Sequence, residues 1–178
     1  MCDSAQEISI WTRMKKGVKM DNPILYILCG CAGCGKSTWA KKFFYSTMCV
    51  EWISRDDIRF EMLKDGEDYF AHEEEVFSKF VKQIQSCLMN DYDVIADATH
   101  LNVKSRKKLL NAIGDNIEYN IIYVYFNTPF EICCGRNEKR EGRARVPDKI
   151  MQSMWNSMQK PAMTEDSRCI GLILMKGY

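Results

Sequence analysis

Short apolar segments recur along the chain, and the spacing between them leaves room for helices. The near-continuous apolar runs cover residues 24–28, 49–53, 93–97, 121–126 and 169–174. Strands that are covered on both faces are apolar at consecutive positions, whereas half-exposed strands alternate. The pattern therefore predicts five strands inside a sheet that has helices on each side.

Amphipathic stretches separate these strands. Residues 73–89 place Val76, Phe80 and Ile84 at the three-and-four spacing of one buried helix face, and residues 103–113 form a basic amphipathic helix. Strands that alternate with helices are joined by right-handed crossovers and pair in parallel. We therefore predict an α/β fold with a mostly parallel five-stranded sheet flanked by helices.

The composition favours one domain. The chain has 178 residues with 46% hydrophobic content, and a domain of this size buries roughly two thirds of its unfolded surface. Residues 1–22 have weak periodicity and mixed charge, so we expect a flexible leader followed by the domain over residues 23–178. Apolar runs are too short for a membrane span, and the first residues lack a signal-peptide core.

The cysteines favour a reducing, cytoplasmic compartment. There are nine, an odd number, and Cys29, Cys31 and Cys34 lie in or beside a glycine-rich loop where cross-linking would obstruct a ligand. Structural zinc is disfavoured, because Cys133 and Cys134 are far along the chain and form no second C-x-x-C pair. The net charge of +1 argues neither for nor against a nucleic-acid partner.

The first predicted strand leads into Gly30-Cys31-Ala32-Gly33-Cys34-Gly35-Lys36-Ser37, which fits the pattern G-x-x-x-x-G-K-[ST]. Its glycines let successive backbone N–H groups point inward, and the helix expected over residues 37–45 offers its positive end to phosphate oxygens. Lys36 would reach the β- and γ-phosphates of ATP, and Ser37 would bind Mg²⁺. We expect nucleotide contacts from Gly33, Cys34, Gly35, Lys36, Ser37 and Thr38.

Polar clusters follow the second and third predicted strands, at residues 55–59 and 97–102. Ligands of open parallel sheets bind at the carboxyl ends of the strands, so these clusters and the glycine-rich loop should meet there. Asp56 or Asp57 is placed to accept a hydroxyl proton, while the other caps the helix that begins there. Asp97 is placed to hold Mg²⁺, through water, or to orient the acceptor.

A basic segment follows the fourth predicted strand. Residues 136–147 are rich in arginine and should form a lid whose guanidinium groups close over the phosphates, although a solvated helix face is the alternative. His100 is on a loop, where a lone histidine is more often an ordinary hydrogen-bonding residue than a catalytic base. The pattern as a whole predicts phosphoryl transfer from ATP.

Together these motifs resemble the kinase domain of bacteriophage polynucleotide 5′-hydroxyl kinases, over residues 24–158. The matching segments are Gly33-Cys34-Gly35-Lys36-Ser37-Thr38-Trp39-Ala40, Arg55-Asp56-Asp57-x-Arg59, Asp97-Ala98-Thr99-His100-Leu101-Asn102, Arg136-Asn137-Glu138-Lys139-Arg140 with Val146-Pro147, and Ser153-Met154-x-x-Ser157-Met158. The resemblance implies that Asp56 is the general base, that Arg59 contacts the phosphate 3′ of the acceptor nucleotide, and that Arg140 stabilises the transferring phosphoryl group.

The remaining expected contacts follow the same motifs. Those to the nucleotide involve Arg136 and Arg140, and those to the acceptor involve Arg59, Asp57, Asp97, Thr99 and Asn102. The lid is slightly longer than the family pattern, so Arg143 or Arg145 can take the place of Arg140. The phosphatase signature D-x-D-G-T does not occur, so we expect no 3′-phosphatase activity.

The expected function is ATP-dependent phosphorylation of a polynucleotide 5′-hydroxyl end, in DNA or RNA, as in nucleic-acid repair. The alternative is a kinase of another hydroxyl, such as a hydroxymethylated base in DNA or a small metabolite. A nucleotide-controlled switch is a third class, but the guanine-specific N-K-x-D motif is missing. The oligomeric state has no signature in the sequence.

Overall fold

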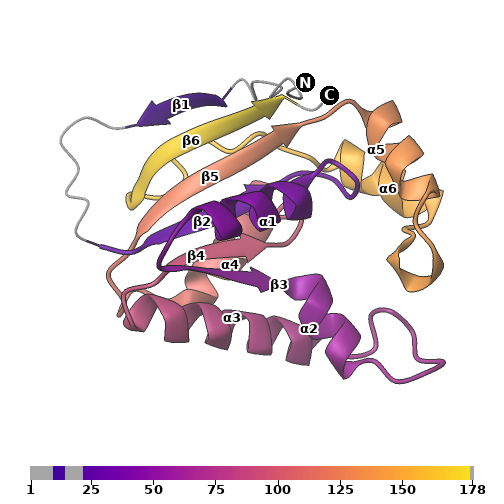
Figure 1. Ribbon diagram of the computed structural model, residues 1–178, viewed down its shortest axis with the longest axis horizontal. Coiled ribbons are helices and arrows are strands. Elements are labelled where there is room, and N and C mark those ends of the chain that lie inside the picture. The colour runs from indigo at the N-terminus through magenta and orange to yellow at the C-terminus, as the bar shows by residue number, and fades with distance from the viewer. Residues whose placement is uncertain (1–9, 15–21, 177–178) are drawn as a thin grey trace, which may run out of the picture.

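A twisted sheet forms the centre of the molecule, whose computed structural model describes residues 10–14 and 22–176 (Figure 1). Within these residues the sheet has six strands in the order β1-β6-β5-β2-β4-β3. The strands are β1 (Ile10–Met14), β2 (Ile24–Cys29), β3 (Val50–Ser54), β4 (Asp93–Asp97), β5 (Asn120–Asn127) and β6 (Cys169–Lys176). Strands β2 to β6 pair in parallel, which confirms the predicted five-stranded α/β sheet.

The helices lie between the strands as the pattern predicts. They are α1 (Lys36–Ser46), α2 (Arg55–Met62), α3 (Glu73–Met89), α4 (Val103–Ile113), α5 (Phe130–Glu138) and α6 (Asp148–Asn156), with a short 3₁₀ turn η1 (Gly142–Ala144). The helices predicted over residues 73–89 and 103–113 have these same bounds. Within the described residues, every helix is too short or too polar to cross a membrane.

Strand β1 was not expected. It lies within the segment predicted to be a leader, and it pairs antiparallel with β6, where Trp11 is opposite Leu174. Its five residues include a threonine and an arginine, so they form no apolar run that would mark a strand. The expectation of a leader for residues 1–9 and 15–21 lies outside the described residues.

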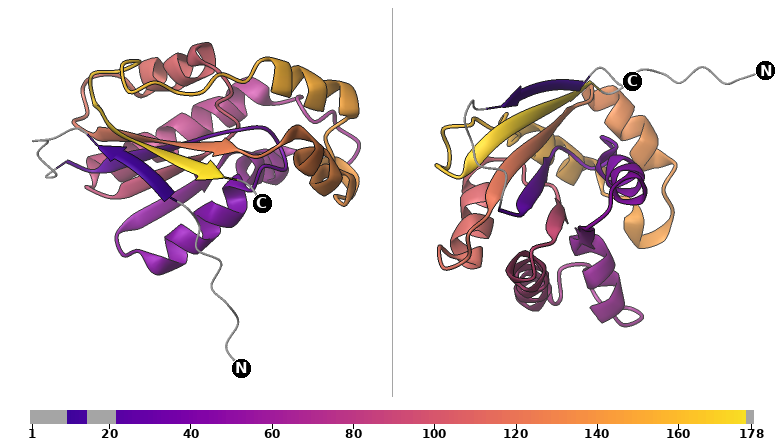
Figure 2. Two further views of the ribbon diagram at one scale, coloured as in Figure 1. Left: turned by 90° about the horizontal axis from the view of Figure 1, so that it is seen from above. Right: turned by 60° about the vertical axis from the view of Figure 1, so that its left-hand side comes forward.

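Alternate residues of β2 point to opposite faces of the sheet and enter two different cores. Leu25 and Ile27 pack with the buried faces of α3 and α4, whereas Tyr26 and Leu28 pack with α1. Figure 2 shows α1 on one side of the sheet and α4 on the other. Because both faces are covered, all six residues of β2 are buried, as the continuous apolar run predicts.

The parallel direction of β2, β3, β4 and β5 brings the loops that follow them to one edge of the sheet. These are the glycine-rich loop, the start of α2, residues 98–102 and the start of α5. The residues that the sequence marks as chemically active are therefore neighbours in space, although they are far apart in the chain.

Candidate active site

The loop between β2 and α1 requires glycine at two positions. Gly33 and Gly35 have φ angles of +76° and +102°, in the left-handed region that disfavours side chains. A Cβ atom at Gly33 would also lie 2.5 Å from the carbonyl oxygen of Cys133 on α5. The glycines therefore let the loop curl tightly over the N-terminus of α1, which is the geometry of an anion-binding site.

Lys36 begins α1 and folds back into this loop. Its Nζ donates hydrogen bonds to the carbonyl oxygens of Gly30 at 2.9 Å and Cys31 at 2.8 Å. The loop is further fixed by Thr128, whose Oγ1 donates to the carbonyl oxygen of Cys34 at 2.9 Å. The ammonium group is thus held at the centre of the loop, where phosphate oxygens would bind.

Asp97 ends β4 beside the first turn of α1. It is buried, its Oδ2 accepts a hydrogen bond from Trp52 Nε1 at 3.2 Å, and its carboxylate is also hydrogen-bonded to Ser37. Burial raises the pKa of Asp97, while the Lys36 charge and these hydrogen bonds oppose the rise. A hydroxyl and a carboxylate side by side are oxygen ligands of the kind that suits Mg²⁺.

Asp56 lies in the first turn of α2 with 63% of its side chain exposed. Its Oδ1 accepts hydrogen bonds from Arg59 Nη1 at 2.6 Å and from the Tyr69 hydroxyl at 2.7 Å. Arg59 is buried and also donates to Glu73 Oε2 at 2.6 Å. These contacts all involve Oδ1 and hold the carboxylate in one orientation, while most of the side chain stays exposed to solvent.

The cap of α2 is neither of the two aspartates that the sequence suggests. Ser54 is the N-cap residue, because its Oγ accepts a hydrogen bond from the backbone N–H of Asp57 at 3.2 Å. Serine is as good a cap as aspartate, and it precedes them in the chain. Asp57 is exposed on the same turn as Asp56.

The loop after β4 supports the glycine-rich loop. The carbonyl oxygen of Thr99 accepts a hydrogen bond from Gly30 N at 2.9 Å, and His100 Nδ1 donates to the carbonyl oxygen of Leu28 at 3.0 Å. Burial lowers the pKa of His100 to about 3, so the imidazole is neutral. Asn102 caps α4, accepting a hydrogen bond from Ser105 N at 2.9 Å.

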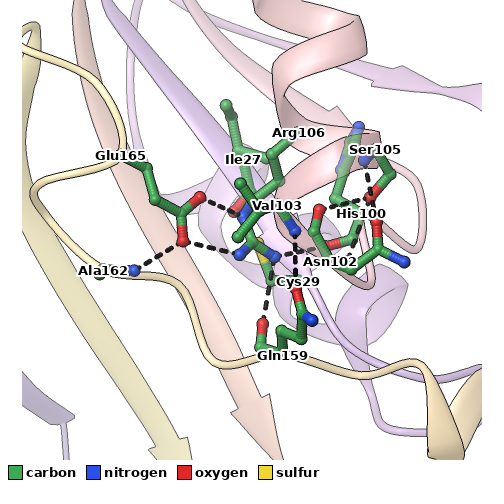
Figure 3. Close-up of polar contacts among 10 residues, drawn as sticks. All are labelled: Ile27, Cys29, His100, Asn102, Val103, Ser105, Arg106, Gln159, Ala162 and Glu165. Carbon is green, nitrogen blue, oxygen red and sulfur yellow. Dashed lines mark hydrogen bonds and ion pairs between the residues drawn. The ribbon is translucent and has the colours of Figure 1, made fainter.

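Arg106 on α4 connects this loop to the segment between α6 and β6, as Figure 3 shows. Its side chain is completely buried, and its Nε and Nη2 donate to the carboxylate of Glu165 at 2.8 and 2.7 Å. Its Nη1 donates to the carbonyl oxygens of His100 and Gln159, each at 3.1 Å. The arginine therefore fixes the backbone behind Thr99.

The lid begins inside α5 and continues through η1. Arg136, in the last turn of α5, donates from Nη1 to the carbonyl oxygen of Gly33 at 3.3 Å, which places its charge beside the glycine-rich loop. Arg140 Nη1 contacts the carbonyl oxygen of Ala144 within the lid at 3.4 Å. The predicted lid over residues 136–147 thus combines the end of a helix with a loop that is largely exposed.

Arg143 extends across to the other side of the site. Its Nη2 donates to the carbonyl oxygen of Lys64 at 2.9 Å, in the loop that follows α2. Arg145 is exposed at the end of the lid. The three arginines that the sequence left as alternatives, at positions 140, 143 and 145, all face one cavity.

This cavity, with a volume of about 1220 Å³, brings most of the predicted site together. The predicted residues that line it are Gly33, Cys34, Gly35, Lys36, Ser37, Thr38, Asp56, Arg59, Asp97, Thr99, Arg136 and Arg140. Asp57 and Asn102 do not line it, so their expected contact with the acceptor stays a prediction. Asp57 is exposed on the first turn of α2, and Asn102 uses its side chain to cap α4.

A comparison with known families agrees with this geometry. The AAA domain family matches residues 25–161, which run from β2 to just beyond α6. The chain belongs to the AAA domain family. Membership implies nucleotide use by the glycine-rich loop, in agreement with the position of Lys36 and the φ angles of Gly33 and Gly35.

Solved structures share the fold of this AAA domain. A chain of the Pnkp1/Rnl/Hen1 RNA repair complex is 24% identical with a TM-score of 0.67, over 80% of this chain and 46% of that one. A fungal RNA kinase is 15% identical with a TM-score of 0.61, over 88% and 76%. A sugar kinase from Janibacter sp. HTCC2649 is 15% identical with a TM-score of 0.58, over 87% and 85%. These likenesses show that the chain shares the fold of these proteins.

Some residues of the AAA domain's site carry no signal in the sequence. Trp52, Tyr69 and Glu73 hold Asp97, Asp56 and Arg59, yet none belongs to a recognisable motif. Within the described residues, no group of three or more His, Cys, Asp and Glu side chains is arranged to hold a metal.

Proposed function

We propose that this chain is a kinase that transfers the γ-phosphate of ATP to the 5′-hydroxyl end of a polynucleotide. The observation that carries the proposal is the position of Asp56, whose exposed carboxylate shares one cavity with the phosphate-binding loop. A slow nucleotide switch would have no use for a carboxylate aimed at an acceptor. Phosphoryl transfer needs such a group together with a phosphate cradle.

On the donor side, the chain binds phosphate through positive charge and inward N–H groups. The loop before α1 would surround the phosphates, with Lys36 at its centre and Arg136 at its rim. Ser37 and Asp97 would hold Mg²⁺, the hydroxyl directly and the carboxylate through water, and the bound ion neutralises phosphate charge. The lid arginines would stabilise charge on the transferring group.

On the acceptor side, Asp56 would take the proton of the attacking hydroxyl. Its Oδ1 is held by Arg59 and Tyr69, which leaves the rest of the carboxylate to face the hydroxyl. Fixed orientation of a base is worth several orders of magnitude in rate, since the reacting atoms must meet within about 3–3.5 Å. Arg59 therefore has a positioning role in this proposal, besides the phosphate contact expected from its motif.

A polynucleotide acceptor is supported by the basic rim of the cavity, where Arg140, Arg143 and Arg145 are exposed. It is also supported by the fold shared with an RNA repair complex and a fungal RNA kinase. A small-molecule hydroxyl is the second candidate, because the sugar kinase shares the fold over 85% of its own length. A gluconokinase from Sinorhizobium meliloti 1021, 14% identical with a TM-score of 0.51, supports the same candidate.

The test is transfer of labelled γ-phosphate from Mg·ATP to short 5′-hydroxyl DNA and RNA oligonucleotides. Oligonucleotides with a 5′-phosphate serve as controls, and hexoses and gluconate are tested in parallel. We expect label on the 5′-hydroxyl ends alone. Label on the small alcohols with none on the oligonucleotides would replace the proposal with its alternative.

The role of Asp56 is tested by Asp56→Asn, with Asp57→Asn as the matched control on the same helical turn. A general base contributes about 10²- to 10⁴-fold, so we expect kcat to fall by that order in Asp56→Asn while ATP binding is unchanged. Asp57→Asn should retain full activity because its side chain lies outside the cavity. Equal activity of the two variants would remove Asp56 from the mechanism.

A further inference from the structure

Aromatic rings form one wall of the cavity beside Asp56. Phe60 is on α2, and Tyr69 and Phe70 are on the loop that leads to α3 (Figure 1). The rings pack edge to face, with centroid distances of 6.2 Å between Phe60 and Tyr69 and 4.9 Å between Tyr69 and Phe70. Phe60 is 40% exposed and Phe70 is 55% exposed. Large apolar groups that stay exposed in a cavity mark a binding surface.

One residue of this wall, Tyr69, is hydrogen-bonded to the proposed base. The Tyr69 hydroxyl donates to Asp56 Oδ1 at 2.7 Å and accepts from Arg59 Nη1 at 2.8 Å. The Arg59 guanidinium also lies 4.4 Å from the Tyr69 ring centroid and 5.9 Å from that of Phe70. The Tyr69 ring therefore has a defined position relative to Asp56, and Phe70 packs against Tyr69.

Two other aromatic side chains of the cavity already pack against aromatic rings of the protein. Trp39 and Phe43 on α1 stack on each other, with centroids 4.9 Å apart and ring planes 9° apart. Phe43 also packs edge-on against Tyr26 of the sheet. Phe60 and Phe70 are the rings of this cavity that rank among the exposed large apolar side chains of the described residues.

We propose that Phe60, Tyr69 and Phe70 form a subsite that binds the nucleobase of the acceptor's 5′-terminal nucleotide. This inference rests on the proposed function. A nucleotide carries its 5′-hydroxyl and its base on the same sugar, so a hydroxyl held at Asp56 brings the base to the adjoining rings. Base–aromatic stacking tolerates every base, because each has a π face.

The lid contacts the loop that carries two of these rings. Arg143 donates to the carbonyl oxygen of Lys64, at the start of the loop that carries Tyr69 and Phe70. Arg143 and Phe70 also line the same cavity. Arginine stacks on bases and attracts phosphate, which suits a terminal nucleotide that is followed by a phosphodiester.

The experiment compares two 5′-hydroxyl oligonucleotides that differ only in the terminal nucleotide, which either carries its base or is abasic. Both retain the sugar, the hydroxyl and the phosphates. We expect kcat/KM to favour the base-bearing end about tenfold, which corresponds to about 1.4 kcal/mol and to the low end of stacking contributions of about 1–3 kcal/mol per base. The KM for ATP should be the same with both.

Substitutions of Phe70 test whether the preference for the base-bearing end arises at this subsite. Phe70→Leu should reduce the preference for the base-bearing end to nearly one, while Phe70→Trp should retain it because indole stacks at least as well. Tyr45→Leu is the matched control, since Tyr45 is an aromatic residue that is 75% exposed and lies outside the cavity. It should leave the preference unchanged.

The outcomes separate this inference from the proposed function. Equal phosphorylation of base-bearing and abasic ends by the unaltered protein would overturn the subsite and leave the proposed function standing. No label on any oligonucleotide would overturn both. A tenfold preference that persists in Phe70→Leu, shown to be folded by its thermal unfolding, would assign base binding to other residues and overturn this subsite.

Discussion

Two buried arginines, Arg59 on α2 and Arg106 on α4, are each paired with a glutamate from another part of the chain. The other acceptors of Arg106 are the backbone carbonyl oxygens of His100 and Gln159, and it does not line the cavity. Arg59 instead donates to the side chain of Asp56, lines the cavity and has a buried Nε without a hydrogen-bond partner in the described residues. We therefore expect Arg106 to stabilise the fold, and we expect Arg59, if the proposed function holds, to position Asp56.

The largest expected effect concerns stability. Arg106→Met leaves the Glu165 carboxylate and two carbonyl oxygens buried without their donor, so the free energy of unfolding should fall by about 3–5 kcal/mol. Urea unfolding measures this. Adding Glu165→Leu should recover part of the loss, because it removes the unpaired charge. A loss below about 1 kcal/mol in the single variant would show that water replaces the arginine.

The Arg106 region should also make stability depend on pH through His100. Its pKa is about 3 in the folded protein, below the ordinary value of about 6.5, so the unfolded chain binds a proton first as pH falls. The contribution is fully present above pH 6.5. It is lost at about 1.4 kcal/mol per pH unit as pH falls from about 6.5 toward 3. In His100→Gln this part of the pH dependence should disappear; an unchanged slope would assign it to other groups.

Arg59 should affect rate more than stability. Arg59→Lys keeps the positive charge but loses the planar guanidinium whose two Nη groups contact Asp56, Tyr69 and Glu73 together. Because the proposed base would then be less well positioned, kcat should fall by about tenfold to a hundredfold. Lys79→Ala, which removes the exposed ion pair with Glu61, is the control and should leave kcat unchanged. If both variants were fully active, Arg59 would belong with Arg106 as a structural residue.

The smallest effect is expected at the start of the helix that carries Arg106. Asn102→Ala removes the cap of α4, which should cost about 1 kcal/mol in the free energy of unfolding and leave kcat/KM for the acceptor unchanged. Thermal unfolding and initial rates together check this. A rise in the acceptor KM alone would return Asn102 to the acceptor site, where its motif placed it.

The strands and the glycine-rich loop were predictable because their signals are local. A continuous apolar run is enough to indicate β2, and the glycine spacing before Lys36 follows from a backbone with positive φ angles. The residues alone left Asp56 and Asp57 as alternatives, and only the family resemblance favoured Asp56 as the base. Which carboxylate meets Tyr69 and the cavity depends on how α2 is rotated in the fold, and no local pattern records that rotation.

The partners of the two arginines could not be inferred from the sequence for the same reason. Glu165 is 59 residues from Arg106 in the chain, and they meet only because the segment before β6 crosses α4. Glu73 is one of three glutamates in the first turn of α3. The helix dipole alone explains acidic residues there, so the sequence does not single out Glu73 as the partner of an arginine. Contacts of this kind follow from packing rather than from any repeating pattern.

The pairing of β1 with β6 has a consequence for solubility. Strand β6 reads Cys-Ile-Gly-Leu-Ile-Leu-Met-Lys and is paired with β5 on one side and with Ile10–Met14 on the other. An apolar strand with an unpaired row of backbone N–H and C=O groups is a template for pairing with other molecules. Pairing with Ile10–Met14 therefore covers this row on β6 and makes the edge of the sheet a five-residue strand that contains a threonine and an arginine, a composition less prone to pair with other molecules.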